Sequence, residues 1–471
     1  MRLRRISMLL TVAAGTLMSG PVFALSAKDA VLYVLETNPE IKAAEANKQA
    51  IEFELDQSRA FRVPKFELEA WAGSSLNNGT TTSDLTASDD PISGYQVRGR
   101  MTQVLFDGFR TRSEIERQAY RVDAAALRVL ERSEFLSLEA IRLYADVLRA
   151  GRLVALAQDN LTYHQRLYDR LQGGFDSGAL PVGDIQQAQE RVFLAEDTLI
   201  SFQLDAQDIR DNFLAVVGVQ PENLGSLPSI GGAMPGSLDE ALAIARRNNP
   251  TVRFTQADVG TAEARAREAN ANRYPTLNLE ADVLTGRDVN GFEGDVDDAR
   301  IGLTLRYEFQ GGRKRAARQE QVRRTSQSRA EMLQQARRVD KEVRNSWANL
   351  DAARKRKSVV QDQANLSRDL RATYEEEYEV GVRSLLDILN TQNALFQAEA
   401  NLVNANSLEE YVRFRVLASM GMLLPSLGIE PPEDATPYAV KENRAPSVSE
   451  ANQAQHFDAK SFSDWRRTVG N

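Results

Sequence analysis

The sequence predicts a mixed α/β membrane protein: a homotrimeric 12-stranded β-barrel, four strands per chain, continued by a long α-helical coiled-coil tunnel. Three observations predict this fold in the 471-residue chain. The chain contains a tandem internal repeat, each copy has strands of alternating polarity, and each copy has a helix of unusual length.

Composition excludes several classes of protein. The chain has 58 basic and 66 acidic residues, a net charge of −8, no cysteine, and two histidines, His164 and His456. An acidic chain does not favour nucleic acid as a partner. With so few histidines and no cysteine, we expect no metal site, no cofactor, no catalytic residues and no enzymatic activity.

The N-terminus predicts export. Arg2, Arg4 and Arg5 precede an apolar run, and residues 22–24 read Val-Phe-Ala, where a signal peptidase accepts small residues. We therefore expect residues 1–24 to be a signal peptide that is removed.

The repeat is visible as a constant spacing between similar segments. Residues 26–39 end in Asn-Pro, and so do residues 237–250, which are 211 positions later. Beyond a polar loop the spacing becomes 203, which pairs Gly178 with Gly381 and Asp184 with Asp387. We expect a first repeat at 25–230, a second at 231–424, and a polar, proline-rich tail at 425–471 that is either mobile or wrapped on the body.

Each repeat contains one long β-hairpin. Apolar residues alternate with polar ones around residues 66–70, 95–102, 277–283 and 299–309, and loops rich in Gly, Ser, Asn and Asp separate the paired segments. Such strands have one polar and one apolar face. Four of them cannot close a barrel in lipid, whereas three chains supply twelve.

A very long helix follows each hairpin. Residues 110–172 contain no proline and one glycine, and an apolar seam of period 3.5 is interrupted only by Ser133 and His164. At ~1.5 Å per residue this helix spans roughly 95 Å and packs as a coiled coil. Each long helix ends at a glycine turn, and a return helix opens at Asp184 or Asp387, where a carboxylate favours the helix N-terminus.

These features resemble the TolC-like outer-membrane efflux proteins, which act in type I secretion or tripartite efflux systems. The resemblance covers about residues 26–425 and is carried by the paired Asn-Pro segments, the Phe-x-Gly turns at 106–108 and 309–311, and the run YEVGVRSLLDIL at 378–389. It implies a passive channel in the bacterial outer membrane with a periplasmic extension. It also implies three kinds of partner besides lipid: two further copies of the chain, a periplasmic adaptor, and an inner-membrane ABC or proton-driven transporter.

The resemblance further implies roles for residues at the periplasmic tip. Asp387 matches a carboxylate ring that narrows the aperture, Tyr378 and Arg383 match residues that bond to the neighbouring hairpin, and Asp184 matches their acidic partner. Five residues match the turns that contact the adaptor: Gly178, Leu180, Gly381, Val382 and Leu385. Asn390 and Gly183 depart from the family pattern. These departures predict a gate that selects cations less strongly and a changed set of bonds that hold the aperture closed.

Simpler interpretations stay open for these residues. Asp184 and Asp387 could be helix caps alone, and Arg383 could be a solvated charge. His164 is expected to be packed in the coiled coil, and the glutamates at 375–377 are expected to form a solvated helix face.

Two other kinds of protein deserve comparison. A periplasmic adaptor is the alternative function, but it carries one helical hairpin and no membrane strands. A purely structural coiled coil leaves the strands unexplained. Within the family, the sequence favours the secretion branch slightly over drug efflux.

Overall fold

The computed structural model describes residues 24–76, 91–176, 180–291 and 293–443. The predicted signal peptide, apart from its last residue, lies outside this part of the chain. So do Gly178, His456 and the segment after residue 443.

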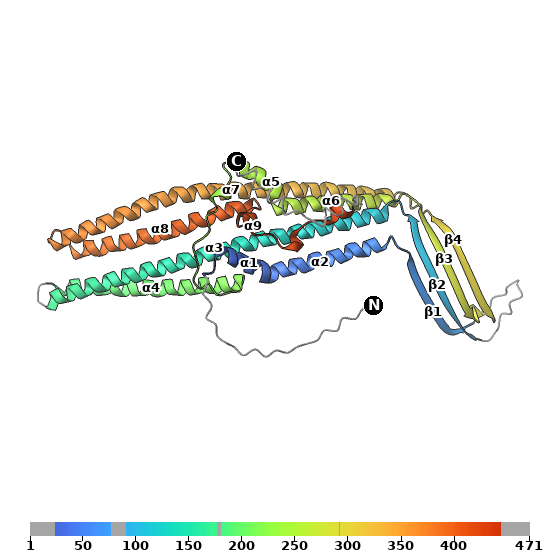
Figure 1. The fold of residues 1–471 in the computed structure, drawn as a ribbon, viewed down its shortest axis with the longest axis horizontal. Coiled ribbons are helices and arrows are strands. Elements are labelled where there is room, and N and C mark those ends of the chain that lie inside the picture. Colours follow the sequence, from blue (N-terminus) through green and yellow to red (C-terminus); the bar gives the residue numbers. More distant parts are fainter. Residues whose placement is uncertain (1–23, 77–90, 177–179, 292, 444–471) are drawn as a thin grey trace.

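Two sets of elements follow each other in the same order, and together they form one elongated body with a sheet at one end (Figure 1). The first set is α1 (Ala27–Thr37), α2 (Pro39–Ala60), β1 (Lys65–Ser75), β2 (Ile92–Phe106), α3 (Arg110–Asp176) and α4 (Val182–Val217). The second set is α5 (Leu238–Asn248), α6 (Pro250–Ala271), β3 (Thr276–Arg287), β4 (Asp295–Arg306), α7 (Arg313–Glu379) and α8 (Leu385–Ser419). Short helices complete the described chain: η1 (Gly231–Ala233), η2 (Val289–Gly291), α9 (Leu423–Ser426), η3 (Glu433–Ala435) and α10 (Ala439–Asn443).

The paired Asn-Pro segments have the same local structure in both copies. The Asn38 side chain accepts a hydrogen bond from Glu40 N at 3.0 Å and donates one to the Val216 carbonyl at 3.1 Å. Asn249 does the same with Thr251 N and the Ser419 carbonyl, both at 2.9 Å. Each asparagine therefore caps one helix and ties its start to the end of the return helix of the same copy.

The four strands form one antiparallel sheet in the order β1-β2-β3-β4, so the two hairpins are joined through β2 and β3. The predicted alternation is confirmed: one face is apolar and exposed, with Leu68 80% and Ile301 73% accessible. On the other face Asp282 is buried beside Arg98, Arg100 and Arg300, at 3.9, 3.2 and 3.5 Å. Strands β1 and β4 each have one edge without a partner among the described residues.

The two long helices, α3 and α7, have 67 residues each and run from the sheet to the opposite end of the molecule. At ~1.5 Å per residue each is about 100 Å long. The predicted seam of α3 is buried except at Val147, Val154 and Tyr168. Near the sheet α3 packs on α2 and α6, and nearer the far end on α4 and α8.

The described part of the C-terminal segment is wrapped on the body. Leu424 and Ile429 are buried in the main apolar core. Asp434 accepts hydrogen bonds from Lys48 and Gln49, both at 2.8 Å, and Asp123 accepts one from Ala439 N at 2.7 Å. Of the two expectations for the tail, mobile or wrapped, residues 425–443 follow the second.

Candidate functional site

The two helical hairpins end together at the tip of the body farthest from the sheet (Figure 1). An apolar cluster joins them, which we call the tip cluster. Its buried members come from both hairpins: Leu167, Leu171, Ile185, Ala188, Leu385, Ile388 and Leu389. Four tyrosines pack around it: Tyr163, Tyr168, Tyr374 and Tyr378. The tip is therefore a packed junction of α3, α4, α7 and α8.

The turn between α7 and α8 is built by Gly381. Val382 N donates to the Glu377 carbonyl and Gly381 N to the Tyr378 carbonyl, both at 2.9 Å. Gly381 has φ +79°, in the left-handed region, so these bonds form a Schellman motif with glycine at its required position. This motif reverses the chain and leaves Val382 72% exposed beside it.

Asp387 caps helix α8. Its Oδ2 atom accepts hydrogen bonds from Ser384 Oγ at 2.8 Å and from Ser384 N at 3.1 Å, and Ser384 Oγ accepts from Asp387 N at 3.2 Å. This is a capping box. The bonds from the Ser384 side chain and main chain lower the pKa of Asp387, with a smaller contribution from Arg383. Asp387 thus stays ionised, and only one of its oxygens is engaged in the cap.

Asp184 lies in the first turn of α4 but does not cap it. The N-cap of α4 is Pro181, and the helix has no side-chain cap bond. Instead Asp184 lies near Tyr378 of the other hairpin: burial raises the pKa of Tyr378, and the negative charge of Asp184 raises it further. The charge of Asp184 therefore acts on Tyr378 across the two hairpins, without a hydrogen bond between them in the described chain.

Arg383 is held within its own hairpin. Its Nε donates to Glu377 Oε2 at 2.5 Å, and its guanidinium lies 4.0 Å from the centre of the Tyr374 ring. The bond to Glu377 raises the pKa of Arg383. In the described chain Arg383 does not contact the α3–α4 hairpin, so a bond to a neighbouring hairpin remains a prediction that needs the other copies.

The residues that match adaptor-contact turns fall into two groups. Gly381 and Val382 are exposed, whereas Leu385 is 5% exposed and belongs to the tip cluster. Leu180 is half-buried against the same cluster. Gly178 lies outside the described residues. Four other apolar residues in the described part of the tip are exposed and were not singled out from the sequence: Phe175, Val182, Val380 and Leu386.

Behind the tip cluster a polar layer connects α3, α7 and α8. Tyr163 Oη donates to Glu375 Oε1 at 2.7 Å, and Gln392 Nε2 donates to Asn160 Oδ1 at 2.9 Å. Arg371 lies 5.4 Å from the centre of the Tyr163 ring. The glutamates at 375 and 377 are thus bonded to Tyr163 and Arg383, and the expectation of a solvated face is wrong for them. Helical spacing offers only Arg371, four residues before Glu375 and 3.8 Å from it, whereas Tyr163 and Arg383 are distant in sequence or in an irregular turn.

His164 lies on the buried seam of α3, as its position in the heptad pattern predicted. Burial lowers its pKa to about 4, and Arg191 adds to this effect. Its Nδ1 has no hydrogen-bond partner among the described residues. The ring is therefore neutral at neutral pH and acts as a packed side chain.

The described ranges contain no group of three or more His, Cys, Asp or Glu side chains that could hold a metal ion. None of the helices in those ranges is both long and apolar enough to cross a membrane. The tip thus presents carboxylates, tyrosines and exposed valines.

Comparison with known proteins agrees with this geometry. The family model described as outer membrane efflux protein matches residues 33–219 and 241–409, one span in each copy of the repeat. The outer membrane efflux protein BepC of Brucella suis is 26% identical over 431 residues, which cover 89% of this chain and 92% of BepC.

Two further similarities span most of the chain. The alkaline protease secretion protein AprF of Pseudomonas aeruginosa is 23% identical over 446 residues, 89% of this chain and 90% of AprF. The solved structure of the outer membrane protein VceC of Vibrio cholerae has a TM-score of 0.72 at 16% identity, covering 84% of this chain and 96% of VceC. At that identity the likeness to VceC concerns the fold.

Proposed function

The chain belongs to the outer membrane efflux protein family, and from this premise we propose that it is the exit duct of a tripartite export system. Three copies form a channel through the outer membrane and a tunnel into the periplasm. The duct is passive, and an inner-membrane ABC or proton-driven transporter supplies the energy through a periplasmic adaptor. The family is one of transport channels rather than a known class of enzyme.

The sheet is the observation that carries this proposal. Its apolar face is exposed along its length, and β1 and β4 have open edges in the described chain. Neither feature is stable in water or in lipid unless other strands close the sheet and lipid covers the face. Three copies give twelve strands, an even number large enough for a water-filled lumen lined by Arg98, Arg100 and Arg300. A periplasmic adaptor, the alternative, has no use for such a sheet.

The helical part has two complementary edges. Among the four helices near the tip, α4 and α7 lie at opposite edges, with α3 and α8 between them (Figure 1). On α4, Leu204 is exposed next to Asp205 and Asp208, which have no ion pair in the described chain. On α7, Val359 is exposed next to four consecutive basic residues, 354–357.

These two patches lie at the same distance from the tip of the helical body. Leu204 and Lys357 are both about 33 Å from the tip at ~1.5 Å per residue. An acidic, apolar edge on one copy can therefore meet a basic, apolar edge on the next. Such a head-to-tail contact closes into a ring when the rotation from one copy to the next adds up to a full turn.

The tip supports the proposed gate. In a three-fold ring the Asp387 carboxylates of three copies approach one another, and like charges repel at short range. The tip cluster, which joins residues of both hairpins, holds them together against this repulsion. The exposed Val380, Val382 and Leu386 offer an apolar rim for the adaptor. Adaptor binding opens the tip only if the adaptor prefers the open state.

The names of the relatives indicate the general kinds of cargo. BepC is named for efflux and AprF for secretion of alkaline protease. We propose that this chain exports either small toxic compounds or a secreted protein by the same route.

Cysteine cross-linking tests the ring. The chain has no cysteine, so a single pair can be introduced, Leu204→Cys on α4 with Val359→Cys on α7. Oxidation in the outer membrane should give covalent trimers that dissociate on reduction. The control pair Leu204→Cys with Leu333→Cys, which places the second cysteine much farther from the tip, should give no cross-link. Monomers from both pairs, or open-ended ladders from the first, would contradict a closed ring of three.

A further inference from the structure

Each of the four junctions between helix and strand carries an exposed aromatic residue beside a basic one. The pairs are Phe61–Arg62, Phe109–Arg110, Arg273–Tyr274, and Phe309 followed by Arg313 and Lys314. All four aromatic side chains are exposed, Phe309 most of all at 82%. The junctions lie together where the helical body meets the sheet (Figure 1). We call these nine residues the junction collar.

The aromatic residues of the collar continue the apolar face of the sheet. A bulge in β2 between Val104 and Phe106 places Phe106 opposite Leu277, on the apolar face. The Phe106 ring lies edge-on to Phe109 at 5.8 Å and to Tyr274 at 6.4 Å between ring centres. The collar therefore begins where the surface that faces lipid ends.

The cations of the collar form no ion pair with a carboxylate in the described chain. Arg62, Arg273 and Arg313 form no ion pair or side-chain hydrogen bond there. Arg110 bonds only to the amide of Asn272, and Lys314 only to the main-chain oxygen of Glu308. The nearest carboxylate along the chain, Asp107, accepts hydrogen bonds from Thr111 N at 2.8 Å and Thr111 Oγ1 at 2.6 Å. The charge of Arg110 also acts on Glu268, but the collar as a whole has more cations than carboxylates and is a positive band without ion pairs.

We infer that the junction collar binds the headgroups of anionic phospholipids in the membrane leaflet that faces the helical body. Aromatic side chains settle at the level of lipid headgroups, and neighbouring arginines bond phosphate groups in a bidentate way. Clusters of basic residues at a membrane surface select anionic lipid. The inference rests on the proposed function, since it requires that the sheet be inserted. Three copies repeat the band around the whole barrel.

The test measures lipid selectivity at the protein surface. The purified full-length protein is reconstituted in vesicles of phosphatidylcholine containing phosphatidylglycerol, and spin-labelled lipids of both kinds report the fraction immobilised by the protein. We expect the wild type to prefer phosphatidylglycerol by about threefold or more, and the preference to fall at high salt. The triple variant Arg62→Gln, Arg273→Gln, Arg313→Gln should bring the ratio close to one.

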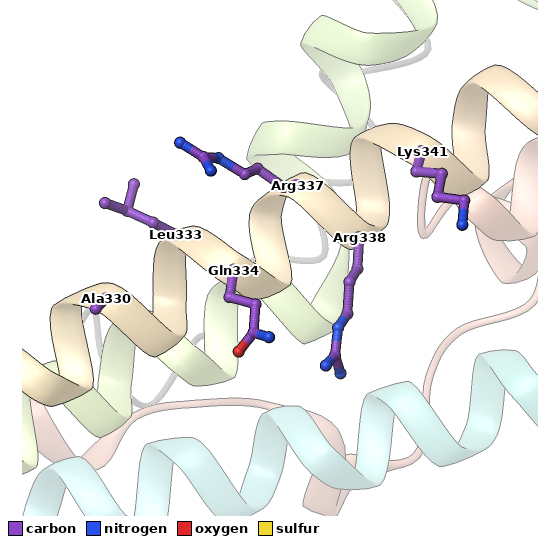
Figure 2. A pocket seen from close by; sticks show the side chains of 6 residues that line it. All are labelled: Ala330, Leu333, Gln334, Arg337, Arg338 and Lys341. Atoms are coloured by element: carbon purple, nitrogen blue, oxygen red, sulfur yellow. The ribbon is translucent and has the colours of Figure 1, made fainter.

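A matched control comes from another exposed basic group. Arg337, Arg338 and Lys341 line a hollow of about 530 Å³ on α7 and project into solvent, with no ion pair in the described chain (Figure 2). They lie about 36 Å along α7 from Arg313, at ~1.5 Å per residue. Changing these three residues to glutamine should leave the lipid preference unchanged. Changing the three collar arginines to lysine should keep most of it.

The outcomes separate the inference from the proposed function. If the wild type is inserted and conducts ions but shows no preference, the collar inference is wrong and the channel stands. The inference would also be overturned if the collar and control triple variants lost the preference for phosphatidylglycerol equally, because the preference would then come from the total charge of the protein. If the wild type cannot be inserted at all, the proposed function fails and the inference with it. A wild-type ratio of one overturns the inference even if a variant does not assemble, and the arginine-to-lysine variant keeps the positive result testable if the glutamine triple does not assemble.

Discussion

Replacing Glu134 by glutamine should remove a pH dependence from the attachment of the C-terminal segment. Glu134 lies in the middle of α3 and is 5% exposed. Its two oxygens accept hydrogen bonds from Leu423 N at 3.1 Å and Leu424 N at 3.2 Å, the start of α9. Burial raises its pKa to about 8, although the two N–H groups act in the opposite direction.

The magnitude follows from the pKa difference. The folded state holds the proton more tightly than the unfolded state, whose pKa is the ordinary 4.5. The stabilisation is therefore complete below pH 4.5, is lost as the pH rises towards 8, and changes no further above that. At ~1.4 kcal/mol per unit the total is at most about 5 kcal/mol, of which about 2 kcal/mol is lost between pH 6 and 8. Glutamine stays neutral and has no such loss.

Hydrogen exchange with mass spectrometry measures this locally. In the purified protein, the amides of residues 421–429 should lose protection between pH 6 and 8.5 after correction for intrinsic rates. In Glu134→Gln the protection should not change with pH, although it should start lower than in the wild type, because the amide nitrogen of glutamine cannot accept from the second N–H group. Glu134→Ala should lose it at every pH, because two buried N–H groups are left without acceptors, at ~1–3 kcal/mol each.

A control separates the buried carboxyl from a general charge effect. Asp159→Asn, which removes an exposed charge from the same helix, should behave like the wild type. The reasoning is refuted if wild-type protection does not change with pH. It is also refuted if Glu134→Gln changes as much as the wild type.

Three further changes have defined outcomes. Gly381→Ala puts a side chain at φ +79°, at a cost of ~1–2 kcal/mol, and should speed hydrogen exchange in residues 378–384 alone. His164 has a pKa lowered to about 4, so stability is lost as the pH falls from 6.5 to 4. His164→Leu should therefore narrow the gap between melting temperatures at pH 7 and 4.5, and an unchanged gap would count against this. Asp282→Asn leaves three arginines without their carboxylate and should shift the reversal potential in a KCl gradient towards anion selectivity. An unchanged reversal potential would contradict the placement of Asp282 on the lumen side of the sheet.

The regular elements were predictable from the sequence because their patterns are local. Alternation fixed the two faces of the sheet, and the period of 3.5 located the buried seam of α3, including His164. The cap at Asp387 was also readable, since Ser384 and Asp387 stand at capping-box spacing. For Asp184 the same argument from position fails, because α4 begins after a proline without a side-chain cap.

The long-range contacts were not predictable. Glu134 and Asp123 accept hydrogen bonds from main-chain N–H groups of a segment about 300 residues later. The residues next to them in the sequence give no sign that these carboxylates bind that segment. Arg383 had several carboxylates within reach of its turn, and only the folded turn selects Glu377. The junction collar as a whole is not visible in the sequence, where only the basic run at 313–315 after a strand indicates the membrane-proximal end, because its pairs are far apart along the chain and meet only at the end of the sheet.

Single-channel conductance tests the central claim most directly. The purified protein, in planar bilayers, should show small, cation-selective channels, and Asp387→Ala should change their size or selectivity because it removes the charge at the tip. An account in which three copies form a gated duct is contradicted if neither protein conducts and the purified chain stays monomeric in water without detergent.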